Sequence, residues 1–168
     1  SEQLDSIVAR YADQVGPLNG ARLIARAWTD PEFKARLLDD ATSIVHKWKL
    51  EGGQVDRLIV KENTPSIHNV VVCTLCSCYP WAILGLPPKW YKSPEYRSRI
   101  VVEPRTVLSE MGLQLDESTE IRVWDSSAEV RYLVLPEQPP ETVGLPEDEL
   151  AALISRDAMI GTARVEPV

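Results

Sequence analysis

All three cysteines of the chain fall within six consecutive positions, at Cys73, Cys76 and Cys78. An odd number of cysteines in so short a run does not form a disulfide framework. Thiolates are instead strong, soft ligands for metal ions. A strand that ends in a tight C-x-x-C-x-C turn can direct three sulfur atoms at one ion, so the spacing predicts a metal centre in this segment.

The sulfur ligands alone are too few for a simple zinc site. A four-thiolate site needs a fourth cysteine, which the sequence lacks. His46 or His68 could supply a nitrogen, but we expect His68, five residues before Cys73, to be a solvent-facing or supporting histidine. The backbone amides of Ser77 and Cys78 become strong nitrogen donors when deprotonated. Two amides and three thiolates together suit a trivalent cobalt or iron ion. Such an ion keeps one open position for water or substrate, so the segment would be a Lewis-acid site.

The elements that position the cysteines are expected to be strands and turns. Residues 70–72 form a short run of valines that leads directly into the cysteines, and residues 58–60 form a similar run. Two more strands are expected at residues 120–124 and 130–135, joined by a turn at residues 125–128.

Helical patterns fill the first third of the chain and recur after the cysteines. Apolar residues at helical spacing predict the early helices, and Thr29 or Asp30 is expected to cap the helix that begins at Pro31. Ser93-Pro94 and Glu103-Pro104 are typical of helix starts. The helices are expected at residues about 4–11, 18–28, 31–49, 94–101, 104–111 and 146–153.

Together these elements predict an α+β fold in two parts. Residues 1–50 form a helical N-terminal arm, and residues 51–168 form a layered α/β domain with a mixed sheet and the metal-binding cysteine loop. Glu51-Gly52-Gly53 marks the change from one pattern to the other. The arm lacks catalytic groupings, so we expect it to serve packing or subunit docking.

Charge and hydropathy exclude several classes of function. Against 25 acidic residues the chain has 18 Lys and Arg, a net charge of -7, which argues against binding of nucleic acid. No apolar run approaches the roughly 20 residues of a membrane span, and no secretory signal opens the chain, so we expect a cytoplasmic protein. The basic residues between Lys89 and Arg105 alternate with aromatic ones, which favours a surface that faces another subunit.

The segment from Cys73 to Trp81, C-T-L-C-S-C-Y-P-W, resembles the α subunit of nitrile hydratase, and it is equally similar to the homologous catalytic subunit of thiocyanate hydrolase. The resemblance covers nearly the whole chain and implies the α-subunit fold of that family. Its other motifs are residues 19–22, 27–31, 62–65, 84–88, 90–93, 96–99, 103–105, 121–125, 131–132, 134–136 and 159–161.

The resemblance implies a specific metal centre. The three cysteine sulfurs and the amides of Ser77 and Cys78 would hold one non-corrin Co(III) or non-haem Fe(III). Cys76 would be oxidised to sulfinic acid and Cys78 to sulfenic acid, both steps of thiol oxidation. Thr74 and Tyr79 favour cobalt over iron. The implied activity is that of a lyase that hydrates a nitrile to an amide, with the Cys78 sulfenate oxygen or a water that it activates as the nucleophile, and with Cys76 and Ser77 beside it.

Three further residues correspond to supporting positions of the family. Trp81 is expected to line the substrate pocket, with a plain core tryptophan as the alternative. Gln54, nineteen residues before Cys73, lies near the family's supporting glutamine, although residues 52–61 depart from the family pattern. Arg131 corresponds to an arginine that supports the metal loop, and its alternative is a surface ion pair worth under about 1 kcal/mol.

The resemblance also implies partners. Arginines of a β subunit would hydrogen-bond the oxidised sulfurs, so the chain alone is expected to be inactive, and a metallochaperone or activator is expected to load it. The short chain suggests a β part split into two chains. Hydrolysis of thiocyanate to carbonyl sulfide and ammonia is the alternative activity, and a cysteine-based metal or redox module is the alternative without catalysis.

Overall fold

The computed structural model describes residues 18–50, 57–75 and 79–167 of the chain. The helix expected at residues 4–11 and the predicted site residues Gln54, Cys76, Ser77 and Cys78 lie outside these ranges. The division into an arm and a catalytic domain stays a prediction.

Three helices form the early part of the described chain: α2 (Leu18–Thr29), α3 (Pro31–Asp39) and α4 (Ala41–Lys47). The Oδ1 atom of Asp30 accepts hydrogen bonds from the backbone N–H groups of Glu32 and Phe33, at 3.1 and 3.2 Å. This cap and the proline that follows start α3 as the sequence predicts.

The prediction of one continuous helix over residues 31–49 is wrong, because the chain breaks at Asp40. The N–H of Asp40 closes α3 on the carbonyl of Arg36 at 2.8 Å. Its carboxylate accepts from the N–H of Ser43 at 3.1 Å and so caps α4. The apolar stripe continues through Ala41, Ile44 and Val45, which is why hydrophobic spacing alone hides the break.

The predicted strands are present and form two parallel pairs. Strand β1 (Arg57–Glu62) pairs with β4 (Val130–Leu135), and β2 (Ile67–Val72) pairs with β3 (Glu120–Asp125). The predicted turn at residues 125–128 therefore carries the chain from one pair to the other. Among the described residues, antiparallel pairing is confined to a bridge between Thr64 and Ile67.

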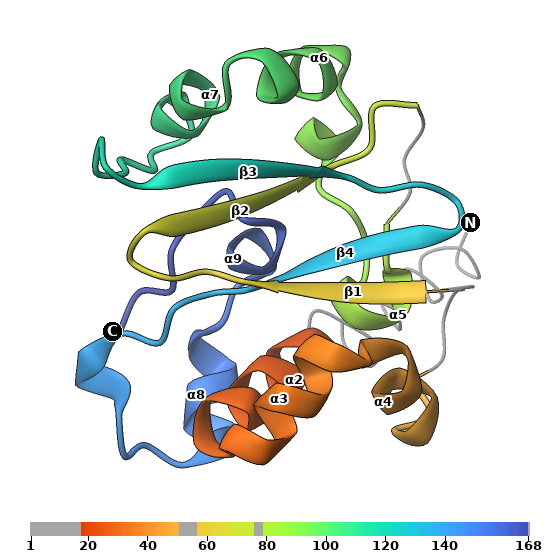
Figure 1. The fold of residues 1–168 in the computed structure, drawn as a ribbon, viewed down its shortest axis with the longest axis vertical. Coiled ribbons are helices and arrows are strands. Elements are labelled where there is room, and N and C mark those ends of the chain that lie inside the picture. The colour runs from red at the N-terminus through yellow and green to blue at the C-terminus, as the bar shows by residue number, and fades with distance from the viewer. Residues whose placement is uncertain (1–17, 51–56, 76–78, 168) are drawn as a thin grey trace, which may run out of the picture.

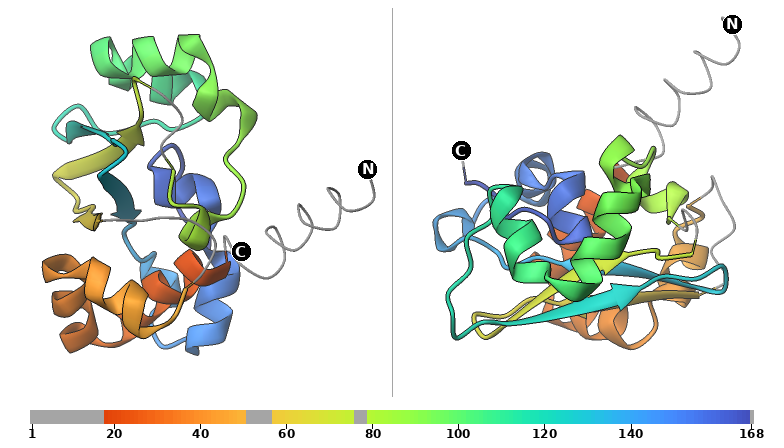
Figure 2. Two further views of the ribbon diagram at one scale, coloured as in Figure 1. Left: turned by 90° about the vertical axis from the view of Figure 1, so that its right-hand side faces the viewer. Right: turned by 90° about the horizontal axis from the view of Figure 1, so that it is seen from above.

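Helices surround the layer of strands. In Figure 1, α6 (Pro94–Val102) and α7 (Pro104–Glu110) lie beyond β3, while α2, α3 and α4 lie beyond β1. The side view in Figure 2 places α9 (Arg156–Ile160) on one face of the strands, where it packs on β4 and β2. Helix α8 (Glu147–Leu153) packs against α2. The arrangement confirms the α+β class.

Several short elements were not expected from the sequence. They are α5 (Trp81–Leu84), η2 (Lys89–Lys92), η3 (Pro140–Thr142) and α9. Each is too short to show the repeated apolar spacing that identifies a longer helix. Helices α6, α7 and α8 match the predicted positions within about one residue.

A single hydrophobic core joins these elements. It takes Leu23 and Ile24 from α2, Val70 and Val72 from β2, and Leu133 from β4, all of which are fully buried. At roughly 1.5–3 kcal/mol for each large apolar side chain, this burial anchors β2 firmly. The strand that leads to the cysteines is therefore a rigid support.

Candidate metal centre

Cys73 lies immediately beyond the carboxyl end of β2 and is fully buried. Every residue of β2 from His68 to Val72 is buried as well, so the strand delivers this cysteine from inside the core. The parallel register places Val72 opposite Asp125 on β3. The N–H of Ser126 then donates to the carbonyl of Val72 at 2.7 Å, which ties the ends of the two strands together.

The first turn of the cysteine loop is held by the carboxylate of Asp125. The N–H of Thr74 donates to Oδ1 at 2.9 Å, and the Thr74 hydroxyl donates to Oδ2 at 2.6 Å. Hydrogen bonds to a charged oxygen are stronger than neutral ones. Both oxygens of Asp125 therefore bind the residue that directly follows Cys73.

The exit from the loop is held by aromatic packing. The ring of Tyr79 is buried and meets Tyr91 edge-on, with 5.1 Å between ring centroids. Tyr96 lies against Tyr91 at 6.0 Å, and its hydroxyl donates to the carbonyl of Val71 in β2 at 2.8 Å. Burial raises the pKa of both Tyr79 and Tyr96, so both phenols stay neutral at physiological pH.

Helix α2 also supports the segment after the loop. The Asn19 side chain donates from Nδ2 to the carbonyl of Ala82 in α5 at 3.0 Å. A Cβ atom on Gly20 would lie 2.8 Å from Sδ of Met159 and 2.9 Å from the carbonyl oxygen of Ile83, so only glycine permits this approach. Helix α2 thereby contacts the segment that follows the loop.

The structure describes only one of the predicted sulfur ligands, Cys73. Within residues 18–50, 57–75 and 79–167, no cluster of three or more His, Cys, Asp or Glu side chains could hold a metal ion. The other predicted ligands, Cys76, Ser77 and Cys78, stay predictions outside the described ranges. Leu75, the last described residue before them, exposes 88% of its surface.

The remaining predicted residues occupy different places. Trp81 is half-buried at the start of α5, directly after the loop, with Nζ of Lys92 at 5.9 Å from its ring. Arg131 lies on β4 and donates from Nη1 to the carbonyl of Ala128 at 3.0 Å. This hydrogen bond connects it with the turn that follows Asp125.

His68 lies at the other end of β2. It is 5% exposed, with Nε2 at 2.6 Å from the carbonyl oxygen of Gly161 and Nδ1 at 3.3 Å from Nδ2 of Asn63. Burial lowers its pKa, although the hydrogen bond to Gly161 opposes the shift. Both ring nitrogens are engaged, which supports the expectation of a supporting histidine.

The role of Asp125 was missed at the sequence level. The motif Ile121–Asp125 was noted, but the contact of Asp125 with Thr74 joins residues 51 positions apart. Its only local signal is a carboxylate placed at the end of a strand. The contact of Tyr96 with Val71 was missed for the same reason.

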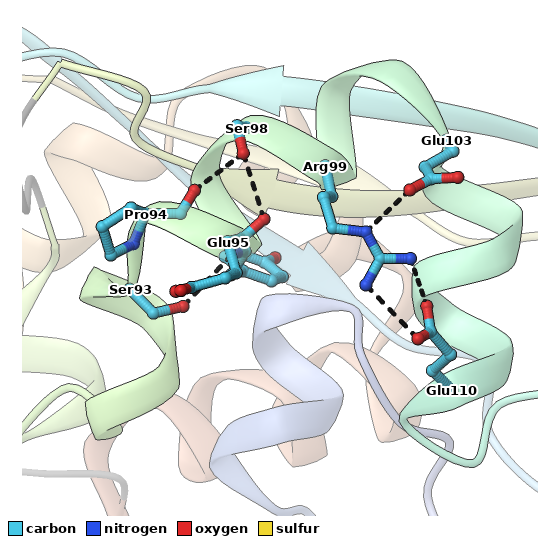
Figure 3. A network of polar contacts seen from close by, with 8 residues as sticks. Ser93, Pro94, Glu95, Ser98, Arg99, Glu103 and Glu110 are labelled. Atoms are coloured by element: carbon cyan, nitrogen blue, oxygen red, sulfur yellow. Dashed lines mark hydrogen bonds and ion pairs between the residues drawn. The ribbon is translucent and has the colours of Figure 1, made fainter.

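A groove of about 390 Å³ opens beside the loop. It is lined by Thr74 and by five residues of α6: Pro94, Arg97, Ser98, Val101 and Val102. In Figure 3, Arg99 of the same helix contacts Glu103 and Glu110. Its Nε atom lies 2.7 Å from Oε1 of Glu103 and its Nη2 atom lies 2.5 Å from Oε2 of Glu110, so the guanidinium ties α6 to α7.

A strand that is buried from His68 onward leads to Cys73, the first cysteine of the C-x-x-C-x-C motif, within an α+β core. The family model for the nitrile hydratase α chain matches residues 1–163. The chain therefore belongs to the nitrile hydratase α-chain family.

Individual relatives agree with this membership. The chain is 56% identical to a nitrile hydratase α subunit from a Rhodococcus species, over 97% of this chain and 82% of the relative. It is 53% identical to the low-molecular-weight cobalt-containing nitrile hydratase α subunit of Rhodococcus rhodochrous, over 97% and 79% of the two chains. The γ subunit of thiocyanate hydrolase from Thiobacillus thioparus is 45% identical, over 94% of this chain and 69% of the relative.

Solved structures show the same fold. A double mutant of the Fe-type nitrile hydratase from Comamonas testosteroni superposes with a TM-score of 0.91 at 44% identity, over 99% of this chain and 82% of the other. A recombinant thiocyanate hydrolase with partially modified cobalt centres gives 0.87 at 42% identity, with the same coverage. The predicted α-subunit fold is confirmed.

Proposed function

We propose that this chain is the catalytic, metal-binding subunit of a nitrile hydratase, which converts a nitrile to the corresponding amide. The observation that carries the proposal is the C-T-L-C-S-C motif at the end of β2, in a chain of the nitrile hydratase α family. Cys73 is buried where that strand ends, and its neighbour Thr74 is clamped by Asp125.

The residues fit a thiolate-bound metal ion. A thiolate that is fully buried, as Cys73 would be, needs a nearby positive charge to offset its loss of hydration. We propose that the sulfurs of Cys73, Cys76 and Cys78 and the amides of Ser77 and Cys78 hold the ion. Cobalt is supported by relatives that are named as cobalt-containing and by Thr74 and Tyr79, although one structural neighbour is of the Fe type.

The bound ion would supply Lewis acidity and lower the pKa of water at the site. The chain's own groups have separate tasks. Asp125 fixes the N–H and hydroxyl of Thr74 at the start of the loop, and the buried ring of Tyr79 fixes its return. Both ends of the loop are thereby held in position.

We propose further roles around this centre. Cys76 is oxidised to sulfinic acid and Cys78 to sulfenic acid during maturation by an external oxidant such as dioxygen, and the Cys78 oxygen, or a water that it activates, is the nucleophile. Trp81 borders the substrate approach, which its half-exposed position after the loop supports. Gln54 is proposed as a supporting residue, and Arg131 is proposed to act through the turn that carries Asp125.

As a nitrile hydratase α-type chain, the protein is expected to work with a β subunit. We propose that β-subunit arginines hydrogen-bond the oxidised sulfurs, that the β part is split into two chains, and that an activator loads the metal. No helix in the described ranges is long and apolar enough to span a bilayer. A cytoplasmic location stays a prediction.

Thiocyanate hydrolysis is the second candidate. The 45% identity to a thiocyanate hydrolase γ subunit and the TM-score of 0.87 support it. Its substrate shares the carbon–nitrogen triple bond with nitriles, so the same loop could polarise either. Relatives at up to 56% identity are nitrile hydratase subunits, which favours the first candidate.

The test is co-expression of this chain with its β subunit or subunits in medium with cobalt, followed by assays with a small nitrile and with thiocyanate. We expect bound cobalt, amide formation, and a mass spectrum with two extra oxygens on Cys76 and one on Cys78. Cys76→Ser, which keeps the loop length, is the control and should lose both metal and activity. Cobalt-loaded, active protein with unoxidised cysteines would contradict the oxidation. A protein that binds zinc and shows neither nitrile hydration nor thiocyanate hydrolysis would favour the cysteine-based metal or redox module without catalysis.

A further inference from the structure

We propose that Tyr96 is a positioning residue for the metal centre, because this one side chain connects the segment that enters the cysteine loop with the segment that leaves it. The inference rests on the proposed function, since the spacing of the two segments matters only if the loop binds a metal ion. It goes further by assigning a task to a buried residue of α6 that is not itself a ligand.

The hydroxyl of Tyr96 binds the strand that enters the loop. It donates to the carbonyl of Val71 at 2.8 Å, across 25 positions of the chain. Val71 lies two residues before Cys73, and both residues are buried. A hydrogen bond inside the core is stronger than the same bond in water. The backbone directly before the first sulfur ligand is therefore fixed from α6.

The ring of Tyr96 is connected to the exit of the loop through one further ring. Its centroid lies 6.0 Å from that of Tyr91, and Tyr91 meets Tyr79 edge-on at 5.1 Å. Tyr79 directly follows Cys78 in the sequence. All three rings are at most 5% exposed. Because a protein core is close-packed, a shift of Tyr96 is passed on to Tyr79.

Tyr96 is itself held at its backbone and at its ring. Its N–H donates to the hydroxyl oxygen of Ser93 at 3.1 Å, and that hydroxyl donates to the carbonyl of Trp90 at 2.8 Å. The ring of Trp90 meets the ring of Tyr96 edge-on, with 4.9 Å between centroids. The phenol is thus preorganised, as the support of a binding site must be.

Packing of the core does not explain the hydroxyl of Tyr96. Phenylalanine would fill nearly the same space without a polar atom, and a polar atom in the core costs free energy unless it forms a hydrogen bond. Burial raises the pKa of Tyr96, so the phenol keeps its proton and remains a donor at physiological pH. Its bond to Val71 is the feature that serves the loop rather than the core.

The first experiment measures how fast iodoacetamide alkylates Cys73 in the full, metal-free chain, with the site identified by mass spectrometry. Tyr96→Phe keeps the ring and removes only the donor. Because the end of β2 then opens more often, we expect alkylation of Cys73 to become about two- to tenfold faster, the factor that one buried hydrogen bond contributes.

Thr119→Val is the matched control for Tyr96→Phe. The Thr119 hydroxyl is buried and also donates to a backbone carbonyl, that of Pro65 at 3.0 Å. Valine has the shape of threonine without this donor. Thr119 lies at the start of β3, away from the loop. The control should lower the urea midpoint by a similar amount and leave alkylation of Cys73 within about twofold of the wild type.

The second experiment measures cobalt in the complex of this chain with its β subunit, expressed in medium with cobalt. We expect Tyr96→Phe to lower the metal affinity at least about tenfold, which is typical of a residue that orients ligands, and to shift the absorption band of the cobalt–thiolate centre. Tyr96→Leu also removes the ring contact with Tyr91 and should lower the affinity further. Thr119→Val should retain the cobalt content and the spectrum of the wild type.

The outcomes separate this inference from the proposed function. Unchanged alkylation and cobalt content in Tyr96→Phe, in a complex that hydrates nitriles, would overturn the positioning role and leave the function intact. Equal loss of cobalt in Thr119→Val would also overturn it, because the loss would then follow overall stability. A wild-type complex that binds cobalt but hydrates no nitrile would contradict the function, while loss of cobalt confined to the Tyr96 variants would still support the positioning role.

Discussion

At its amino-terminal end, strand β2 lies in a closed network of buried polar groups, whereas at its carboxyl end it opens into the cysteine loop. In the network, the N–H of Asn69 donates to Oδ1 of Asn63 at 2.7 Å, and Nδ2 of Asn69 donates to the carbonyl of Glu62 at 2.9 Å. Nε1 of Trp124 donates to Oδ1 of Asn69 at 2.8 Å, and His68 bridges to Gly161.

The carboxyl end is built differently. Cys73 is buried, but Thr74 is bound by one exposed carboxylate, that of Asp125, and Leu75 points into solvent. A fully satisfied buried network specifies one arrangement of strands. The open end leaves Leu75 exposed beside the segment that is proposed to bind the metal ion. The comparison shows how one strand can combine structural rigidity with a site that awaits other components.

The largest expected effect comes from breaking the closed end at Gly161. This residue has a φ of 103°, and a Cβ atom there would overlap the carbonyl oxygen of Asn69 and lie 2.7 Å from Cα of Val70. Gly161→Ala therefore forces the backbone of β2 to move, and we expect a loss of about 3 kcal/mol or more in the free energy of unfolding, measured by urea denaturation.

Gly144→Ala separates backbone strain from the clash. Gly144 has a φ of 96°, close to that of Gly161, but among the described residues no atom beyond its own chain neighbours lies within 4 Å of the position that a Cβ atom would take. Only the cost of the left-handed conformation applies there, about 1–2 kcal/mol. Equal losses for the two variants would show that the contact with β2 is unimportant.

At the open end, Asp125→Asn should affect the metal site more than the fold. An amide can accept from only one of the two Thr74 donors, and it lacks the negative charge. Loss of a group that orients a metal-binding loop typically costs about 10–100-fold in metal affinity or activity, and we expect this range for cobalt content and nitrile hydration. Because Asp125 is exposed, the melting temperature should change little.

Asp116→Asn provides the control for Asp125→Asn. Asp116 is another exposed carboxylate, and it accepts from the N–H of Ser118 at 2.9 Å and from its hydroxyl at 2.8 Å. The loss of negative charge is the same, but both bonds of Asp116 go to Oδ1 and lie in a turn before β3. Comparable loss of cobalt in both variants would indicate a general effect of charge rather than a role for the loop.

Much of the fold could be predicted, because its signals are local. The capped start of α3 and the prolines that open α6 and α7 follow from short motifs. The break at Asp40 was missed because the apolar spacing continues across it. The short helices α5 and α9 are formed by tertiary packing and carry no periodic pattern of their own.

The candidate site also combines features that the sequence predicts with features that only the structure shows. Cysteine type and spacing identify the loop directly in the sequence. The Asp125 clamp, the Tyr96 contact with Val71 and the groove on α6 all depend on how distant segments meet. A single sequence contains no measure of that proximity, so these features required the structure.

The smallest expected effect concerns His68, whose burial lowers its pKa below the ordinary value of 6.5. Between the lowered pKa of His68 in the folded chain and its ordinary pKa in the unfolded chain, the unfolded chain binds more protons. The free energy of unfolding therefore rises with pH in this range. The contribution is fully present above about pH 6.5 and is lost as the pH falls toward the folded pKa, at up to about 1.4 kcal/mol per pH unit. Urea unfolding between pH 7.5 and pH 5.5 measures this slope.

His68→Gln isolates the contribution, because glutamine cannot titrate although it can still form hydrogen bonds. The variant is expected to be less stable at pH 7.5 but to show a flatter dependence on pH. His46→Gln replaces the other histidine, which lies exposed on α4, and serves as the matched control. If the pH dependence of stability is lost in His46→Gln rather than in His68→Gln, then His68 at the closed end of β2 is not its source.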